Sequence, residues 1–152
     1  MSPARSMAVA AALLLALARP ASADDSLLGR WVTPGASAVV ELARCADAST
    51  ICGTVRWLWE AADDRGRPRL DSQNADAKLR TRPLLGLTIL AGLVPRAGGG
   101  WEGSIYNPED GQTYRAILGR RGADSLVVEG CVLFVCRKQI WRKASVLVEA
   151  LR

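Results

Sequence analysis

The carboxylates of one irregular stretch are the side chains best placed in this sequence for acid–base chemistry. They are Asp63, Asp64, Asp71 and Asp76. A pair of carboxylates can cleave a glycosidic bond, one as the acid and the other as base or nucleophile. The chain has no histidine, the commonest general base near neutral pH, and no G-x-S-x-G, phosphate-loop or metal-binding His/Asp pattern. We therefore expect no enzyme, no catalytic residue, no metal and no cofactor; a carboxylate-based hydrolase is the alternative.

Four cysteines are the next residues with chemistry of their own. Cys45, Cys52, Cys131 and Cys136 form an even set, which in an exported protein indicates two disulfides. Three pairings are open, and we favour Cys45–Cys52 and Cys131–Cys136 because each closes a short loop. The alternative is a zinc ion held by four thiolates, which the spacings disfavour because neither is C-x-x-C.

The N-terminal residues have the pattern of a secretory signal peptide. Arg5 precedes an apolar run over 7–18, and the A-S-A at 21–23 fits a cleavage site. We predict a signal peptide over 1–23, cleaved after Ala23, and a single mature domain over 24–152 in the periplasm or outside the cell. The apolar run is too short to span a bilayer, so no stable membrane insertion is expected; a retained anchor is the alternative.

The net charge argues against one class of partner. It is +5 over the whole chain, and loss of Arg5 and Arg19 with the signal peptide leaves +3. This mild excess is scattered along the chain, which is typical of a solvated surface. We predict no nucleic-acid partner and identify no protein partner. The positive charge could still bind an anionic envelope surface or the carboxylate of a ligand.

The elements that must position these residues are mostly strands. Polar and apolar residues alternate, or apolar residues run on, in short segments separated by turn formers. The segments are 30–43 (broken at Pro34-Gly35), 51–60, 84–94, 101–118, 124–132 and 136–144. They predict about eight strands, which favours an all-β antiparallel barrel over a sandwich because closure leaves no exposed edge. The tail 145–152 is left undecided between helix and strand.

Turn formers interrupt the segment 101–118 at its middle. Asn107 and Pro108 predict a type I turn, and Gly111 supplies the positive φ that closes it. We interpret this stretch as a hairpin turn rather than a calcium loop, which needs more oxygen ligands.

The segment 61–83 is the longest stretch without an apolar period. We expect one short helix in it that runs to about Arg80 and ends before Pro83. The candidate caps of this helix are Ser72, Asn74 and Asp76.

The same segment is the candidate lid or interaction surface, because long loops on a rigid barrel often carry function. Asp71, Asn74 and Asp76 would form its polar patch with Arg80 and Arg82. The structural alternative is local: Asn74 or Asp76 caps the helix, and Arg80 or Arg82 pairs with Asp71. We prefer this alternative for Asp76.

Five blocks of the sequence, taken in order, resemble a known family. They are "LGRWVTPG", "ICGTVRWL", "DSQNADAKLRTRPLLGLTIL", "WEGSIYNPEDGQTYRAIL" and "GCVLFVCRKQIWR". Together they are similar to the exported bacterial family called domain of unknown function 2147, and they cover almost all of the mature chain. The resemblance implies a lipocalin-like or fatty-acid-binding-like fold, and the family is biochemically uncharacterised.

Two further expectations come from this resemblance. Gly29-Arg30-Trp31 resembles the G-x-W of lipocalins, in which an arginine of the last strand packs across the indole and closes the barrel. Arg142 is the expected structural partner of Trp31, with Arg137 second. In the family pattern glycine follows the first cysteine of the last block, whereas this chain has "CVLFVC", so another pairing of Cys131 and Cys136 stays open.

A barrel of eight strands encloses either side chains alone or one small ligand. We predict a fatty-acid-like or other amphipathic ligand, with aromatic walls and one arginine at its carboxylate. The candidates are Trp57, Trp59, Trp101 and Tyr106 for the wall, and Arg56, Arg80, Arg82 and Arg115 for the cation. Trp57 and Trp59 share a face with Val55 that we expect to be buried. The alternatives are a barrel filled by its own tryptophans, and a ligand-free scaffold that binds envelope proteins through 61–83.

Overall fold

The computed structural model describes residues 25–145. The predicted signal peptide, its cleavage after Ala23, and the tail from residue 146 lie outside the described residues. Within the described range, no helix is long and apolar enough to cross a bilayer.

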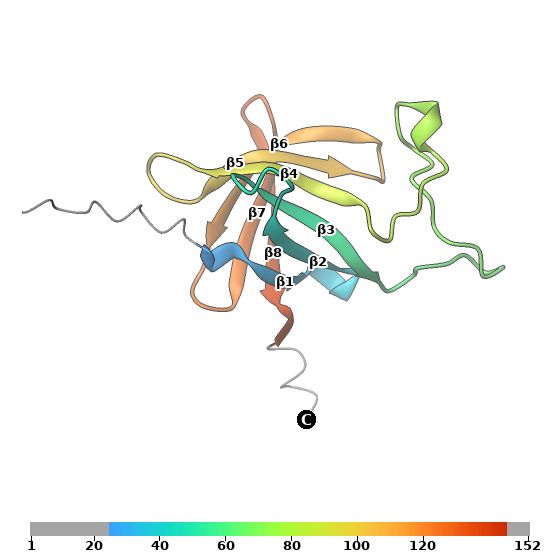
Figure 1. The fold of residues 1–152 in the computed structure, drawn as a ribbon, viewed down its shortest axis with the longest axis horizontal. Coiled ribbons are helices and arrows are strands. Elements are labelled where there is room, and N and C mark those ends of the chain that lie inside the picture. The colour runs from blue at the N-terminus through green and yellow to red at the C-terminus, as the bar shows by residue number, and fades with distance from the viewer. Residues whose placement is uncertain (1–24, 146–152) are drawn as a thin grey trace, which may run out of the picture.

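Eight antiparallel strands close into a barrel, in which each strand pairs with the next in sequence and β1 pairs with β8 (Figure 1). The strands are β1 (Gly29–Val32), β2 (Ala38–Arg44), β3 (Ile51–Leu58), β4 (Thr88–Pro95), β5 (Trp101–Asn107), β6 (Gln112–Arg120), β7 (Ser125–Val132) and β8 (Val135–Lys143). Three short 3₁₀ turns accompany them: η1 (Asp25–Leu27), η2 (Pro34–Ala36) and η3 (Ala77–Leu79). The predicted all-β barrel is confirmed, and the helix predicted in the long connection is the single turn η3.

Because successive strands are antiparallel, their connections alternate between the two ends of the barrel. One end carries η1 and the β2–β3, β4–β5 and β6–β7 connections. The other end, which we call the loop end, carries η2, the long connection 59–87, the β5–β6 turn and the β7–β8 turn. The long connection, green in Figure 1, runs out beside the tip of the β5–β6 hairpin.

Buried apolar side chains form the core of the barrel. The core consists of Leu27, Trp31, Val40, Leu42, Ile51, Leu90, Leu93, Trp101, Ala116, Leu118, Leu126, Val128 and Trp141. The indole Nε1 of Trp31 donates a hydrogen bond of 2.8 Å to the carbonyl of Leu27. This bond satisfies the buried indole and fixes η1 against the core, which closes that end.

The cations over Trp31 come from Arg120 and Lys143, so the expected Arg142 partnership is wrong. Arg120 Cζ lies 5.4 Å and Lys143 Nζ 5.7 Å from the ring centroid. The register explains the difference, because Lys143 is directly opposite Trp31 whereas Arg142 is opposite Val32. Neighbouring residues of a strand face opposite sides of the sheet. Arg142 instead donates to Ser125 Oγ at 2.8 Å.

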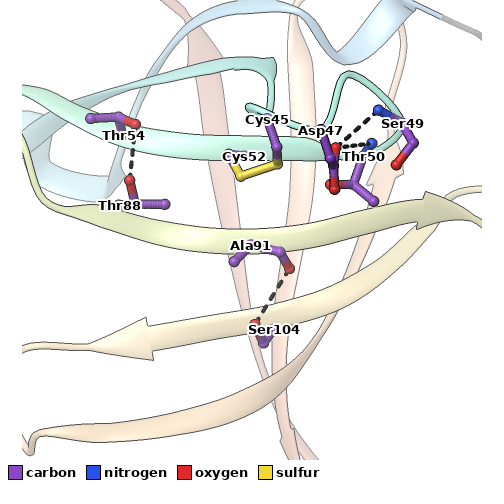
Figure 2. The surroundings of a disulfide bond; sticks show 9 residues. All are labelled: Cys45, Asp47, Ser49, Thr50, Cys52, Thr54, Thr88, Ala91 and Ser104. Carbon is purple, nitrogen blue, oxygen red and sulfur yellow. Dashed lines mark hydrogen bonds between the residues drawn. A yellow bond between two sulfur atoms is a disulfide. The ribbon is translucent and has the colours of Figure 1, made fainter.

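Both disulfides join the local pairs that the short loops favoured. Cys45–Cys52 links the end of β2 to the start of β3 across a turn in which Asp47 Oδ1 accepts from the backbone N–H groups of Ser49 and Thr50 (Figure 2). Cys131–Cys136 joins directly opposite residues of β7 and β8. No free cysteine is left among the four, so the four-thiolate zinc site is not formed.

A shift of register moves Trp57 away from the expected buried face. Val40 pairs with Val55, but Val39 pairs with Trp57, so the residue between Val55 and Trp57 is an extra one in β3. Val39 and Val40 face opposite sides, and their partners must do the same. Val55 is therefore buried, whereas Trp57 is 44% exposed.

Candidate functional site

The interior face of β5, β6 and β7 changes character toward the loop end. One row of directly paired residues is large and buried in the core: Trp101, Leu118 and Val128. The next interior row, two residues further along each strand, is small: Gly103, Ala116 and Gly130. Side chains in this row therefore contribute less volume to the interior than those of the row before it.

The two glycines of this row differ in the space around the missing side chain. A Cβ on Gly103 would lie 2.6 Å from the carbonyl oxygen of Ala91 on the neighbouring strand, so the packing of the backbone requires glycine there. A Cβ on Gly130 would meet Ile105 Cγ2 at 3.5 Å and Tyr114 Cβ at 3.9 Å, which are ordinary contacts. A Cβ therefore fits at Gly130, with Ile105 and Tyr114 as its nearest neighbours.

Arg137 on β8 adds a positive charge next to the Gly130 end of this row. Arg137 is directly opposite Gly130 and lies on the same face of β8 as the buried Trp141, and its side chain is exposed. No carboxylate pairs with Arg137 within residues 25–145. Its positive charge acts on nearby Tyr114, whose hydroxyl donates to Asp110 Oδ2 at 2.6 Å. This hydrogen bond raises the pKa of Tyr114 and is the main cause that lowers the pKa of Asp110.

The arginines that the sequence offered as the ligand's cation are all engaged elsewhere. Arg56 Nε donates to Glu41 at 2.7 Å, and Arg115 Nε donates to Glu102 at 2.7 Å on the outer face of β6. Arg80 Nε donates to the backbone carbonyl of Asn74 at 2.7 Å. Arg82 pairs with Asp71.

The long connection is tied to β5 by a buried polar group that we call the Asp71 cluster: Asp71, Asn74, Arg82 and Tyr106. The Tyr106 hydroxyl donates to Asp71 Oδ1 at 2.5 Å, and Asn74 Nδ2 donates to Asp71 Oδ2 at 2.8 Å. Arg82 donates to the same oxygen through Nε at 2.9 Å and forms an ion pair through Nη2 at 2.8 Å. Asp71 is fully buried, and all its partners donate to it.

Charge balance inside the cluster sets its ionisation. Burial by itself raises the pKa of Asp71, but the hydrogen bonds from Tyr106, Asn74 and Arg82 outweigh burial and lower the pKa below its usual value. Burial, and then the bond to Asp71, raise the pKa of Tyr106. The cluster thus holds a carboxylate anion, a neutral phenol and a guanidinium cation at neutral pH.

These contacts make the cluster a tether. The guanidinium carbon of Arg82 also lies 5.7 Å from the Tyr106 ring centroid. A Cβ on Gly111 would lie 1.9 Å from the carbonyl oxygen of Gln73, so the connection packs directly on the backbone of the β5–β6 turn. Within the described residues no buried side-chain polar atom lacks a partner. The cluster positions the connection at the loop end and leaves no reactive group free.

The remaining predictions for this connection have clear outcomes. Asp76 caps η3, because its side chain accepts from the backbone N–H of Lys78 at 2.9 Å. Asn74 is not the cap; its Oδ1 accepts from Asp76 N at 2.9 Å while its Nδ2 serves the Asp71 cluster. The predicted β5–β6 hairpin turn is present, with Gly111 at φ 70° and its N–H bonded to the carbonyl of Asn107 at 2.9 Å.

The three tryptophans proposed for the wall are not brought together. Trp101 is buried in the core, whereas Trp59 is 74% exposed. Trp57 and Trp59 contact each other edge to face, with centroids 6.1 Å apart, away from Trp101. The outer surface also has two open hollows, one of about 620 Å³ between the β4–β5 turn and the outer faces of β6, β7 and β8, the other beside Arg121 and Arg142.

Gly130 and Arg137 were not among the proposed ligand contacts. One signal was available: if Cys131 and Cys136 are bonded across a hairpin, Gly130 and Arg137 become its next opposite pair. No comparable signal identified Arg120 as the cation over Trp31, because it depends on how β6 faces β1 across the barrel.

Comparisons with known proteins agree with this geometry. The model of a family described as "Uncharacterized protein conserved in bacteria (DUF2147)" matches residues 29–143. Among solved structures, protein HP1028 from Helicobacter pylori, described as belonging to the lipocalin family, is similar with a TM-score of 0.67 and 18% identity, over 82% of this chain and 88% of that chain. At this identity the likeness shows a lipocalin-like fold. No curated protein matches the sequence.

Proposed function

This chain belongs to the DUF2147 family of uncharacterised bacterial proteins, and we propose that it is an exported binding protein that holds one small apolar or amphipathic ligand at the loop end of its barrel. The observation that carries the proposal is the small interior row ending at Arg137, above a core that is closed at the η1 end. A lipocalin-like barrel is a fold suited to holding one small ligand rather than to catalysis.

The chemistry of the row suggests an elongated ligand with an anionic head. Ile105 and the buried Leu90, directly opposite it, offer apolar contact beside Gly130. Arg137 offers a guanidinium without a carboxylate partner in the described part of the chain, and guanidinium groups bind carboxylates through paired hydrogen bonds. A fatty acid fits both features. Its chain would lie along the small row, and its carboxylate would reach Arg137.

The two disulfides support an exported location. Disulfides persist in oxidising compartments such as the bacterial periplasm and are rare in the cytosol. The signal peptide proposed over 1–23 agrees with this, and we propose a periplasmic or secreted mature protein. Amphipathic molecules from the envelope are then available to the barrel.

Titration with a dansyl-labelled fatty acid tests the proposal. We expect saturable binding at micromolar concentration by the mature protein, weakened at least about tenfold in Gly130→Leu because the new side chain would occupy the proposed ligand position beside Ile105 and Tyr114. The matched control is Gly119→Leu, a glycine of the outer face of β6 with open space around it, which should bind as the wild type does. Urea unfolding of both variants checks that they fold.

A second pair of measurements tests the role of Arg137. Arg137→Gln should weaken binding of the free acid and leave binding of its methyl ester unchanged, since the ester has no charge for the guanidinium to meet. Equal binding of the acid by Gly130→Leu and wild type, or no saturable binding by the wild type, would refute the proposal.

A second candidate is an interaction module that uses the connection 61–83. The observation in its favour is the set of exposed apolar side chains along this connection and next to it: Trp59, Leu70, Leu79 and Leu85. A protein partner retained by the wild type and by Gly130→Leu, but lost in Trp59→Ser with Leu85→Ser, would support this candidate instead.

A further inference from the structure

The tip of the β7–β8 hairpin is the most exposed apolar feature of the described chain. Leu133 is 82% and Phe134 95% exposed, and they are flanked by Val132 and Val135, which are also exposed. Four consecutive apolar residues in water are unusual for a soluble domain unless they contact something else. The feature plays no part in the barrel core or in the interior row.

The backbone of this tip also departs from the ordinary rule for turns. Leu133 has φ 51° and is the first of the two residues that connect β7 to β8. Two-residue hairpins that need positive φ at this position normally use glycine or asparagine there. The chain therefore places a large apolar residue where both conformation and solvent disfavour it, and such outliers concentrate at functional sites.

The disulfide holds the tip in this exposed position. Cys131 and Cys136 are bonded directly beneath Val132 and Val135, which face each other across the hairpin. β1 pairs with β8 at Arg142 and Lys143, far from the tip, so the tip half of β8 pairs with β7. The hairpin therefore projects from the barrel, and the bond prevents its ends from separating.

The charge next to the tip identifies the kind of surface that it fits. β8 carries four cations and no acidic residue: Arg137, Lys138, Arg142 and Lys143. Arg137 and Lys138, the two nearest the tip, are both exposed, and Lys138 alone of these two has an acidic partner, Glu129. The apolar side chains lie at the tip and the cations lie behind them. This order matches an anionic bilayer, in which the headgroup phosphates lie at the surface and the acyl chains lie below them.

We propose that the β7–β8 tip docks this protein on the surface of an anionic lipid bilayer, with Leu133 and Phe134 entering the interfacial layer and Arg137 and Lys138 contacting lipid phosphates. This docking is peripheral and reversible. Leu133 and Phe134 are not part of the proposed ligand site, whereas Arg137 belongs to both sites.

Sedimentation with vesicles tests the proposal on the mature protein. We expect binding to vesicles of phosphatidylethanolamine and phosphatidylglycerol, little binding to vesicles of phosphatidylcholine alone, and loss of binding at high salt. The variant Leu133→Gly with Phe134→Ser should reduce the partition coefficient at least about tenfold, since two exposed apolar side chains are removed. The control Leu85→Ser, which removes an exposed leucine of the long connection, should bind like the wild type.

The stability of the double variant separates docking from folding. Glycine relieves the positive φ at 133, so the variant should unfold in urea at the same or a higher concentration than the wild type. Vesicle binding that is equal in variant and wild type, or absent in the wild type, would overturn the proposal. A wild-type dimer in sedimentation equilibrium that the double variant dissociates would overturn it too, because a second copy would then cover the tip.

Discussion

At the scale of single residues, Asp71 shows how this protein keeps a charge inside. A buried carboxylate is costly unless every oxygen has donors, and here a phenol, an amide and a guanidinium supply them. Arg82, the only cation of the cluster, remains partly exposed, so solvent shares part of its charge. The cluster therefore stabilises the loop end only while Asp71 is ionised.

The ionisation of Asp71 predicts a pH-dependent contribution to stability. Because its native pKa is lowered, the contribution is fully present above the unfolded-state pKa of about 3.9 and is lost as pH falls through the native pKa. Asp71→Asn should lower the free energy of unfolding by about 2 kcal/mol at pH 7, with a smaller loss at pH 3. Urea unfolding at both pH values measures this, with Asp64→Asn, an exposed carboxylate of the same connection, as control. An equal loss at both pH values would contradict the assignment.

Contacts between residues close in the sequence were easier to predict than contacts between distant segments. The sequence allowed Asp71 to pair with Arg82 and Asp76 to cap the helix, because both contacts are local. It did not predict that Tyr106 completes the cluster, since that contact joins the long connection to β5. The sequence suggested Arg142 as the cation over Trp31, but the cation on β8 is its neighbour Lys143. An error of one residue matters here because neighbouring residues of a strand face opposite sides of the sheet.

At the scale of elements, the long connection is a fixed arm rather than a free loop. It is bonded to β5 through Tyr106, packs on the β5–β6 turn at Gly111, and contains the capped turn η3. Its backbone forms two isolated bridges, Ala62 with Pro68 and Leu70 with Pro83. These contacts hold the connection beside the loop end of the barrel.

Limited proteolysis measures how firmly the connection is held. It contains trypsin sites at Arg65, Arg69, Lys78 and Arg80. Tyr106→Phe removes the hydroxyl that joins Asp71 to Asn74, and it should speed cleavage within 59–87 about tenfold by raising the population of the open connection. Tyr114→Phe, which loses only its bond to Asp110, should be cleaved at the wild-type rate. Equal rates for Tyr106→Phe and wild type would mean that the cluster does not hold the connection.

The strands were predictable as elements because alternation and turn formers mark their ends. The bulge in β3 was not, because an extra residue leaves no trace in an alternating pattern. For this reason Trp57 and Trp59 were expected inside the barrel and are found on its surface. The local disulfides were predictable because short loops limit the partners of each cysteine.

At the scale of the whole molecule, the barrel has two unlike ends. The η1 end is closed by Leu27 and three buried tryptophans, which gives the fold its apolar core. The loop end has small interior residues, a tethered connection, the exposed Arg137, which has no carboxylate partner among residues 25–145, and an exposed apolar hairpin tip. Closure, disulfides and core stabilise the fold, and we place the proposed ligand and the proposed bilayer contact at the loop end. The difference between the two ends could not be predicted from the sequence, because the residues of the core and those of the small interior row lie on the same strands.

The most direct test of a ligand held inside the loop end is a heteronuclear NMR titration of the mature protein with a fatty acid. We predict saturable shifts of the amide signals of Ile105, Tyr114 and Gly130, with little change at Gly119 and Ile117 on the outer face of β6. Saturable shifts confined to the outer face, or no saturable shifts with any of a panel of fatty acids, would contradict this prediction.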